Sequence, residues 1–156
     1  MSDEADRADA LRALRSLEAA QERVNRNAKR ETEEAKGKLV MELLPVLDNL
    51  DRTITASREH RGDPALLEGV RMVRAQLESV LKRYGVETID AAGARFDPMI
   101  HEAIGLHPVA DPMANGFVVQ QYEPGYAFNG KLLRPAKVLV GKYTAPPHRM
   151  PGPYWH

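Results

Sequence analysis

The apolar residues between Leu11 and Leu50 repeat every eleven positions. Eleven residues make three helical turns at about 3.7 residues per turn, so the repeat keeps its apolar side chains on one face without the left-handed supercoil of a strict heptad. Such a helix has no core of its own and must pack against another helix, most simply a second copy of the chain. We expect this contact at Leu17, Val24, Ala28, Ala35, Leu39, Val46 and Leu50.

The first predicted segment, residues 1–44, is a frayed N-terminus followed by one helix from about residue 11 to residue 44. Its length is roughly 50 Å at about 1.5 Å per residue. Because Ala buries little area, the Ala-rich stripe predicts weak pairing. The basic cluster of this helix suggests a phosphate-binding face, but we favour a solvated helix face because acidic side chains lie nearby; the cluster is Arg23, Arg26, Lys29 and Arg30.

The second segment, residues 45–85, predicts a helical hairpin. Pro45 removes one helical hydrogen bond, so we expect a kink or break just before it. Asp63 as N-cap and Pro64 at the first position predict the start of the second helix, and Gly85 predicts its end as a left-handed cap. Because two antiparallel helices cover only one side of each other, a dimer would close a four-helix bundle.

Gly69 lies inside the second predicted helix, where Gly costs about 1 kcal/mol relative to Ala. Close packing of another helix, or a tolerated weak point in the helix, explains a glycine at this position. Close approach of a partner protein explains it as well, so both interpretations stay open at this point.

From Val86 onward the apolar period changes to two, which predicts strands over residues 86–142. The Asn129-Gly130 pair between apolar runs is a strong hairpin signal, because both turn residues readily adopt positive φ. Pro135 places the return strand at an edge or a bulge. We expect one small β-sheet of about four to six strands, followed by a proline-rich tail at 143–156; the strands are at 86–89, 101–109, 116–122, 126–128 and 131–140.

Composition divides the chain in the same way. All nine aromatic residues lie at Tyr84 or later, and ten of the eleven glycines and ten of the eleven prolines lie at Gly62 or later. The fold class is therefore α+β, with a helical first half that has no globular core and a compact second half.

Charge and chemistry exclude several function classes. The 22 basic and 22 acidic residues balance, which argues against a nucleic-acid binder that works by bulk charge. The absence of Cys excludes disulfides and a cysteine nucleophile. No apolar run is long enough to span a membrane and no secretory leader is visible, so we expect a cytoplasmic protein without membrane contact.

No catalytic motif stands out. His101-Glu102 resembles the start of a zinc-protease helix, but position 105 is Gly instead of the second His, and the five His show no ligand spacing. Asp48 and Asp51 share a helix face that we expect to be polar and solvated. We therefore predict no enzyme activity, no metal and no cofactor.

Five blocks of the sequence together resemble the GrpE family, with matching order and spacing over residues 39–142. The resemblance implies a dimer with a long paired helix, a four-helix bundle and a β-wing from each subunit. It also implies a nucleotide exchange factor that binds the nucleotide-binding domain of a DnaK-type chaperone, opens its cleft and releases ADP. The blocks are ELLPVLDNLDR at 42–52, LLEGV at 66–70, RYGVETID at 83–90, FDPMIHEAI at 96–104 and GYAFNGKLLRPAKVLV at 125–140.

The resemblance also implies the contact residues. Lys131, next to the hairpin turn, matches the basic wing residue that reaches the chaperone, and Gly69 matches the bundle glycine near the chaperone contact. Lys137 stands where the family usually has Met or another apolar residue. The remaining matches to the wing strand, some packed inside and some facing the partner, are Arg134, Pro135, Ala136, Val138 and Val140. Matches that we interpret mainly as structural are Phe96, Asp97, Pro98 and His101.

Two other functions fit the same pattern. The chain is a dimeric coiled-coil scaffold if its β-domain binds some other protein. It is a single-stranded nucleic-acid binder if Tyr126 and Phe128, which alternate on one face, form a stacking platform. We favour a place in the sheet core for both aromatic residues.

Overall fold

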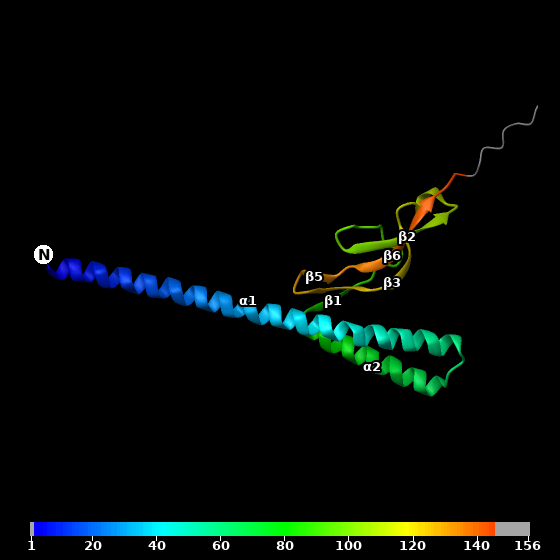
Figure 1. Ribbon diagram of the computed structural model, residues 1–156, viewed down its shortest axis with the longest axis horizontal. Helices are drawn as coiled ribbons and strands as arrows, with labels where there is room; N and C mark the ends of the chain where they lie inside the picture. Colours follow the sequence, from blue (N-terminus) through cyan, green and yellow to red (C-terminus); the bar gives the residue numbers. More distant parts are fainter. Residues whose placement is uncertain (1, 146–156) are drawn as a thin grey trace, which may run out of the picture. The chain divides into compact units, whose positions relative to one another are not determined.

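The computed structural model describes residues 2–145 and begins with the helix α1 (Ser2–Glu59). Packing divides the chain into two units, with the division between Leu44 and Pro45. Helix α2 (Pro64–Arg83) follows α1 (Figure 1). The predicted tail lies outside the described residues from residue 146 onward. The remaining elements are β1 (Val86–Ile89), β2 (His101–Val109), the short 3₁₀ helix η1 (Pro112–Ala114), β3 (Val118–Glu123), β4 (Gly125–Phe128), β5 (Lys131–Arg134) and β6 (Ala136–Tyr143).

The first unit is helical from Ser2 onward, so the expected start near residue 11 is wrong. Asp3 and Glu4 lie in the first turn, where acidic side chains interact favourably with the helix dipole. The apolar stripe of this unit is open to solvent, since Leu17 and Val24 are each 65% exposed. Among residues 2–145, Leu17 and Val24 of the stripe are therefore left uncovered.

Pro45 does not end the helix. α1 continues through it to Glu59, so the expected break is wrong. Pro45 is exposed, and water can bond the carbonyl oxygen that loses its amide partner. Leu44 and Leu47 on either side are buried, and apolar burial of this kind offsets the cost of a proline inside a helix.

The ends of α2 match the prediction. The Asp63 side chain accepts a hydrogen bond from the Ala65 amide at 2.9 Å, and Pro64 is the first helical residue. Gly85 has φ of 95° directly after the helix-capping residue Tyr84. A residue with a Cβ rarely adopts this angle, which explains the glycine there.

The β-domain contains two sheets instead of the single sheet expected. Within the described residues the strand orders are β1-β4-β5 and β2-β6-β3. The reason is Pro135, which lacks the amide needed for a ladder bond and separates β5 from β6 (Figure 1). β5 pairs with β4, whereas β6 pairs parallel to β2 and antiparallel to β3.

Strand β6 supplies most of the core of the β-domain. The buried cluster contains Ala91, Val118, Ala136, Val138 and Val140, with Ile89 and Phe96 packed against it. Tyr126 and Phe128 are buried as well, which supports a core position over a stacking platform. No helix among residues 2–145 is long and apolar enough to cross a membrane.

Candidate functional site

The β4–β5 hairpin carries Lys131, which is exposed directly after the turn. Asn129 and Gly130 have φ of 46° and 80°, as the Asn-Gly signal predicts. The Asn129 amide donates to the Gly85 carbonyl oxygen at 3.0 Å. The turn is thus fixed to the chain just after α2, and Lys131 is presented from an anchored hairpin.

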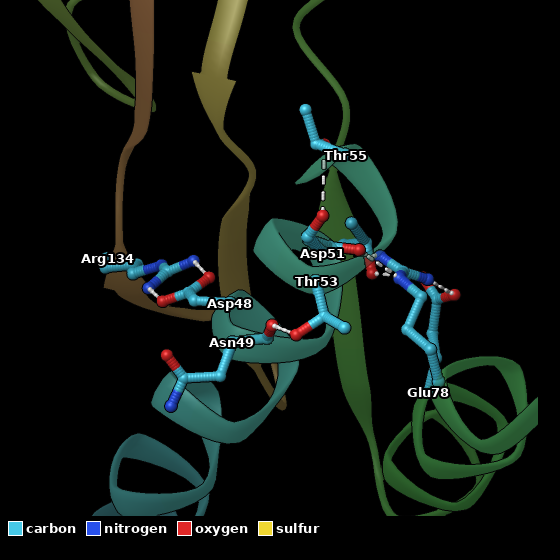
Figure 2. Close-up of polar contacts among 9 residues, drawn as sticks. Asp48, Asn49, Asp51, Thr53, Thr55, Glu78 and Arg134 are labelled. Atoms are coloured by element: carbon cyan, nitrogen blue, oxygen red, sulfur yellow. Dashed lines mark hydrogen bonds and ion pairs between the residues drawn. The ribbon is translucent and has the colours of Figure 1, made fainter. Parts of the chain in front are cut away.

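Arg134, at the end of β5, forms a two-bond ion pair with Asp48 of α1 (Figure 2). Nη1 donates to Oδ2 at 2.6 Å and Nη2 donates to Oδ1 at 2.7 Å. The hydrogen bonds that Arg134 donates to Asp48 raise the pKa of Arg134 above its ordinary value. The side chains are only 18% and 19% exposed, so the expectation of a solvated Asp48 is wrong.

Arg74 of α2 forms a second ion-paired group with Asp51 and Glu78 (Figure 2). Its Nε donates to Asp51 Oδ1 at 2.6 Å, and this bond raises the pKa of Arg74. Thr88 of β1 donates to Glu78 Oε1 at 3.1 Å. Asp51, like Asp48, was expected on a solvated face but lies in a contact between elements.

Tyr126 of β4 interacts with charges of both ion-paired groups. The Arg134 guanidinium carbon lies 5.1 Å from the centre of its ring, and the charges of Arg74, Asp51 and Glu78 act on its hydroxyl. Burial raises the pKa of Tyr126 to about 12. Among the described residues, the hydroxyl has no hydrogen-bond partner. We name these residues the junction cluster, which consists of Asp48, Asp51, Arg74, Glu78, Tyr126 and Arg134.

The block from Phe96 to His101 has a structural role, as expected. The Asp97 side chain accepts from the Met99 amide at 2.9 Å and so forms the turn. The Asp97 amide donates to His101 Nδ1 at 2.9 Å, and the His101 side chain is buried. In the part of the chain that the structure describes, no group of three or more potential ligands is arranged to hold a metal ion.

The structure separates the predicted contact residues into three environments. Lys131 and Gly69 are exposed. They lie far apart, because Gly69 is on the order of 24 Å along the helix from Gly85, the residue that contacts the hairpin. Arg134 lies in the junction cluster and Pro135 is partly buried beside it. The wing-strand residues Ala136, Val138 and Val140 are buried in the core.

The residues that sequence reasoning missed are Arg74 and Glu78, together with the pairing of the two aspartates. The i,i+4 spacing of Arg74 and Glu78 was visible as a local signal. The partner of Asp48 was not, because Arg134 is 86 positions away. Lys137, the departure from the family pattern, pairs with Glu123 at 3.2 Å.

The fold defines an α+β protein in which a long helix and a helical hairpin are joined to a two-sheet β-domain. The family model described as GrpE matches residues 3–142, from the first turn of α1 to the end of β6. The chain belongs to the GrpE family.

Individual relatives agree with this assignment. The GrpE protein of Lactiplantibacillus plantarum is 40% identical over 104 residues, which cover 67% of this chain and 52% of the relative. The GrpE protein of Brevibacillus choshinensis is 37% identical over 129 residues, which cover 80% of this chain and 71% of the relative. The chain spans about half the length of several curated relatives that it matches.

Proposed function

We propose that the chain is an adenine-nucleotide exchange factor for a DnaK-type chaperone. It binds the nucleotide-binding domain of that chaperone, opens the cleft and so releases ADP. The observation that carries the proposal is the match of the GrpE family model to residues 3–142, which reach from the first turn of α1 into β6. We also propose a cytoplasmic location, as for bacterial members of this family.

The proposed mechanism is a difference in affinity and involves no covalent chemistry. A factor that binds the open, empty chaperone more tightly than the closed, ADP-bound chaperone shifts the equilibrium toward the open state. By reciprocity, nucleotide that closes the cleft lowers the affinity for the factor by the same ratio. ATP arriving at the chaperone then releases the factor. The factor needs no cofactor for this action.

The proposed contact centres on Lys131. Its ammonium group is exposed on a hairpin that the Asn129–Gly85 hydrogen bond fixes in place. Ala136, Val138 and Val140 support the wing from inside the core, whereas Arg134 and Pro135 shape the connection from β5 to β6. Gly69 on α2 is a second proposed contact, because a Cβ at this position would meet nothing within 4 Å and the surface there is open.

We propose that the functional form is a homodimer. Four large apolar side chains of the stripe on α1 are exposed, namely Leu17, Val24, Leu39 and Val46. Exposed apolar stripes of this kind are typical of helix pairing. A second copy presents an identical stripe and so fits the repeat. The stripe residues that would meet are Leu17, Val24, Ala28, Ala35, Leu39, Val46 and Leu50.

The test is stopped-flow release of a fluorescent ADP analogue from a DnaK-type chaperone. We expect the chain to accelerate release by orders of magnitude, and Lys131→Ala to weaken the effect while the circular dichroism spectrum stays unchanged. Lys142→Ala, another exposed lysine of the β-domain, is the matched control. A folded dimer that leaves the release rate unchanged would contradict the proposal and favour a scaffold whose β-domain binds another protein.

A further inference from the structure

We propose that Arg134 and Asp48 form a latch that sets the orientation of the β-domain on the helical hairpin. In this proposal Arg134 is a positioning residue and does not touch the chaperone. The consequence for chaperone binding rests on the proposed function above. The latch itself is a property of this chain and can be tested without a partner.

The position of Arg134 in the chain is the first observation. It is the last residue of β5 and directly precedes Pro135, where the chain passes from the β1-β4-β5 sheet to the β2-β6-β3 sheet. Its Nε also donates to the Pro124 carbonyl oxygen at 3.1 Å. Pro124 links β3 to β4 and is the other nearby crossing between the sheets. One guanidinium therefore holds both crossings and, through Asp48, the helix α1.

The geometry of the ion pair is the second observation. A guanidinium that makes two parallel bonds to a carboxylate fixes direction as well as distance. Both side chains are shielded from solvent, at 18% and 19% exposed, so salt screens this pair less than a surface pair. Removal of one partner leaves the other charge partly buried and unpaired, which carries a larger cost than loss of a surface bridge.

The rest of the junction cluster supports the same arrangement. Asp51 lies almost one helical turn after Asp48 and accepts a hydrogen bond from Arg74. Glu78 accepts a hydrogen bond from the Thr88 hydroxyl of β1. The Arg134 guanidinium lies over the face of the Tyr126 ring. Side-chain hydrogen bonds thus join β1 to α2 through Thr88 and Glu78, and β5 to α1 through Arg134 and Asp48.

The latch is separate from the core that folds the β-domain. The buried cluster of Ala91, Val118, Ala136, Val138 and Val140 contains no residue of α1 or α2. Loss of the Arg134–Asp48 pair should therefore leave the two sheets folded, while the range of orientations that they adopt on the helices becomes broader. A binding surface held in many orientations has a lower apparent affinity, because only the competent fraction binds.

The orientation is measurable by electron-spin distance spectroscopy on the full chain. The sequence has no Cys, so Arg58→Cys near the end of α1 and Met113→Cys in η1 accept spin labels without background. Dilution with unlabelled chain leaves only the distance within one chain. We expect a narrow distance distribution for the parent and broad distributions after Asp48→Asn or Arg134→Gln.

Two variants sharpen the distance measurement. Lys137→Gln breaks the Lys137–Glu123 pair, which lies between neighbouring strands of one sheet, and should leave the distribution narrow. Arg134→Lys keeps the charge but loses the two-bond geometry, so it should give an intermediate width. Circular dichroism verifies that each variant is folded. A narrow distribution in both Asp48→Asn and Arg134→Gln would overturn the latch.

Affinity for the nucleotide-free nucleotide-binding domain of the chaperone distinguishes positioning from direct contact. We expect Asp48→Asn and Arg134→Gln each to lower the affinity at least tenfold. The swapped pair Asp48→Arg with Arg134→Asp should restore both a narrow distribution and most of the affinity. A swap that restores the distribution but not the affinity would show that Arg134 touches the chaperone and would overturn the positioning role.

The single variants keep the test decisive if the swapped pair fails to fold. Asp48 lies on α1, so loss of affinity in Asp48→Asn that matches the loss in Arg134→Gln supports positioning, whereas full affinity in Asp48→Asn contradicts it. If the parent chain does not bind the chaperone at all, the proposed function fails. The distance distributions still decide whether the latch exists.

Discussion

Residues 2–44 and residues 45–145 use their apolar side chains in opposite ways. In the first region Leu17 and Val24 lie on one helix face and are open to solvent. In the second region Val118 and Val138 are buried between strands, and ion pairs connect the elements. The first region has a repeating apolar pattern that is largely exposed, although Val40 and Leu44 near its end are buried, and the second has a buried core without a repeating pattern.

This difference shows where each region obtains its stability. A helix with an exposed stripe gains little from its own chain, because most helix stability in proteins comes from packing of an apolar face. Its stability should therefore depend on protein concentration through pairing. The β-domain is stabilised by contacts within one chain, so its stability should be independent of concentration. Substitutions in the two regions should separate these behaviours.

The largest effect is expected for Gly125→Ala at the start of β4. A Cβ there would lie 2.6 Å from the Ala136 amide nitrogen and 3.1 Å from the Arg134 carbonyl oxygen. Because both are backbone atoms, relief requires the strands to move apart, and we expect a loss of about 3 kcal/mol in the free energy of unfolding. Urea unfolding followed by near-ultraviolet circular dichroism measures it, since every aromatic residue lies at Tyr84 or later. A loss below about 1 kcal/mol would show that the backbone around Gly125 can move apart at little cost.

The next effect concerns the first region. Val24→Ala shortens one stripe side chain in each subunit and should weaken the dimer by about 2 kcal/mol, which is roughly 30-fold in the dissociation constant. Glu22→Ala, on the opposite face of the same helix, is the control. Analytical ultracentrifugation measures the dissociation constants. Equal constants for Val24→Ala and the parent would remove the stripe from the dimer contact, and neither variant should alter unfolding of the β-domain.

Gly69→Ala should act in the opposite direction to Gly125→Ala. A Cβ at Gly69 meets nothing within 4 Å and alanine is the better helix former, so we expect α2 to gain about 1 kcal/mol. Thermal unfolding at 222 nm gives this value. Chaperone affinity measured on the same variant decides between the two interpretations of this glycine. A more stable variant with weaker binding identifies a partner contact, and unchanged binding identifies a tolerated weak point.

The smallest effect is expected for Tyr126→Phe. The buried hydroxyl has no hydrogen-bond partner among residues 2–145, so its removal should raise the free energy of unfolding by about 0.5–1 kcal/mol at neutral pH. Urea titrations of both proteins at neutral pH measure this gain. A destabilised Tyr126→Phe protein would show that the hydroxyl is bonded in solution.

The raised pKa of Tyr126 also predicts that the free energy of unfolding depends on pH. The pKa of Tyr126 is about 12 in the folded chain and roughly 10 in the unfolded chain. The unfolded state therefore loses its proton first, so the stability from Tyr126 is complete below pH of about 10 and falls as pH rises toward about 12. Urea titrations across this window should show a smaller decline for Tyr126→Phe than for the parent. Parallel curves would contradict a raised pKa.

Local signals predicted most of the fold. The N-cap Asp63, the cap Gly85 and the turn Asn129-Gly130 each act through neighbouring backbone atoms, so the sequence nearby specifies them. Pro45 predicts a kink or break from its local cost alone, and that cost is offset by the burial of Leu44 and Leu47 on either side, which the sequence nearby does not show. Pro135 was expected at an edge or bulge, and the structure shows that it divides two sheets.

The candidate site was less predictable from the sequence. Lys131 follows a recognisable turn, and its exposure follows from that turn. The wing-strand residues Ala136 and Val138 matched the family, but the match alone did not distinguish a packed side chain from a contacting one. The Asp48–Arg134 pair depends on which face of α1 the β-domain covers, which is a tertiary property that neither the helix period nor the strand period specifies.

The central claim is that the chain favours the empty state of a DnaK-type chaperone, and isothermal titration calorimetry tests it most directly. The nucleotide-binding domain of the chaperone is titrated with the chain in the absence of nucleotide, with ADP and with ATP. The account predicts tight binding to the empty domain and weaker binding in both nucleotide-bound states, by the ratio in which the chain lowers nucleotide affinity. Equal affinity for the empty and ADP-bound domains would contradict it, because a ligand that binds two states equally shifts neither.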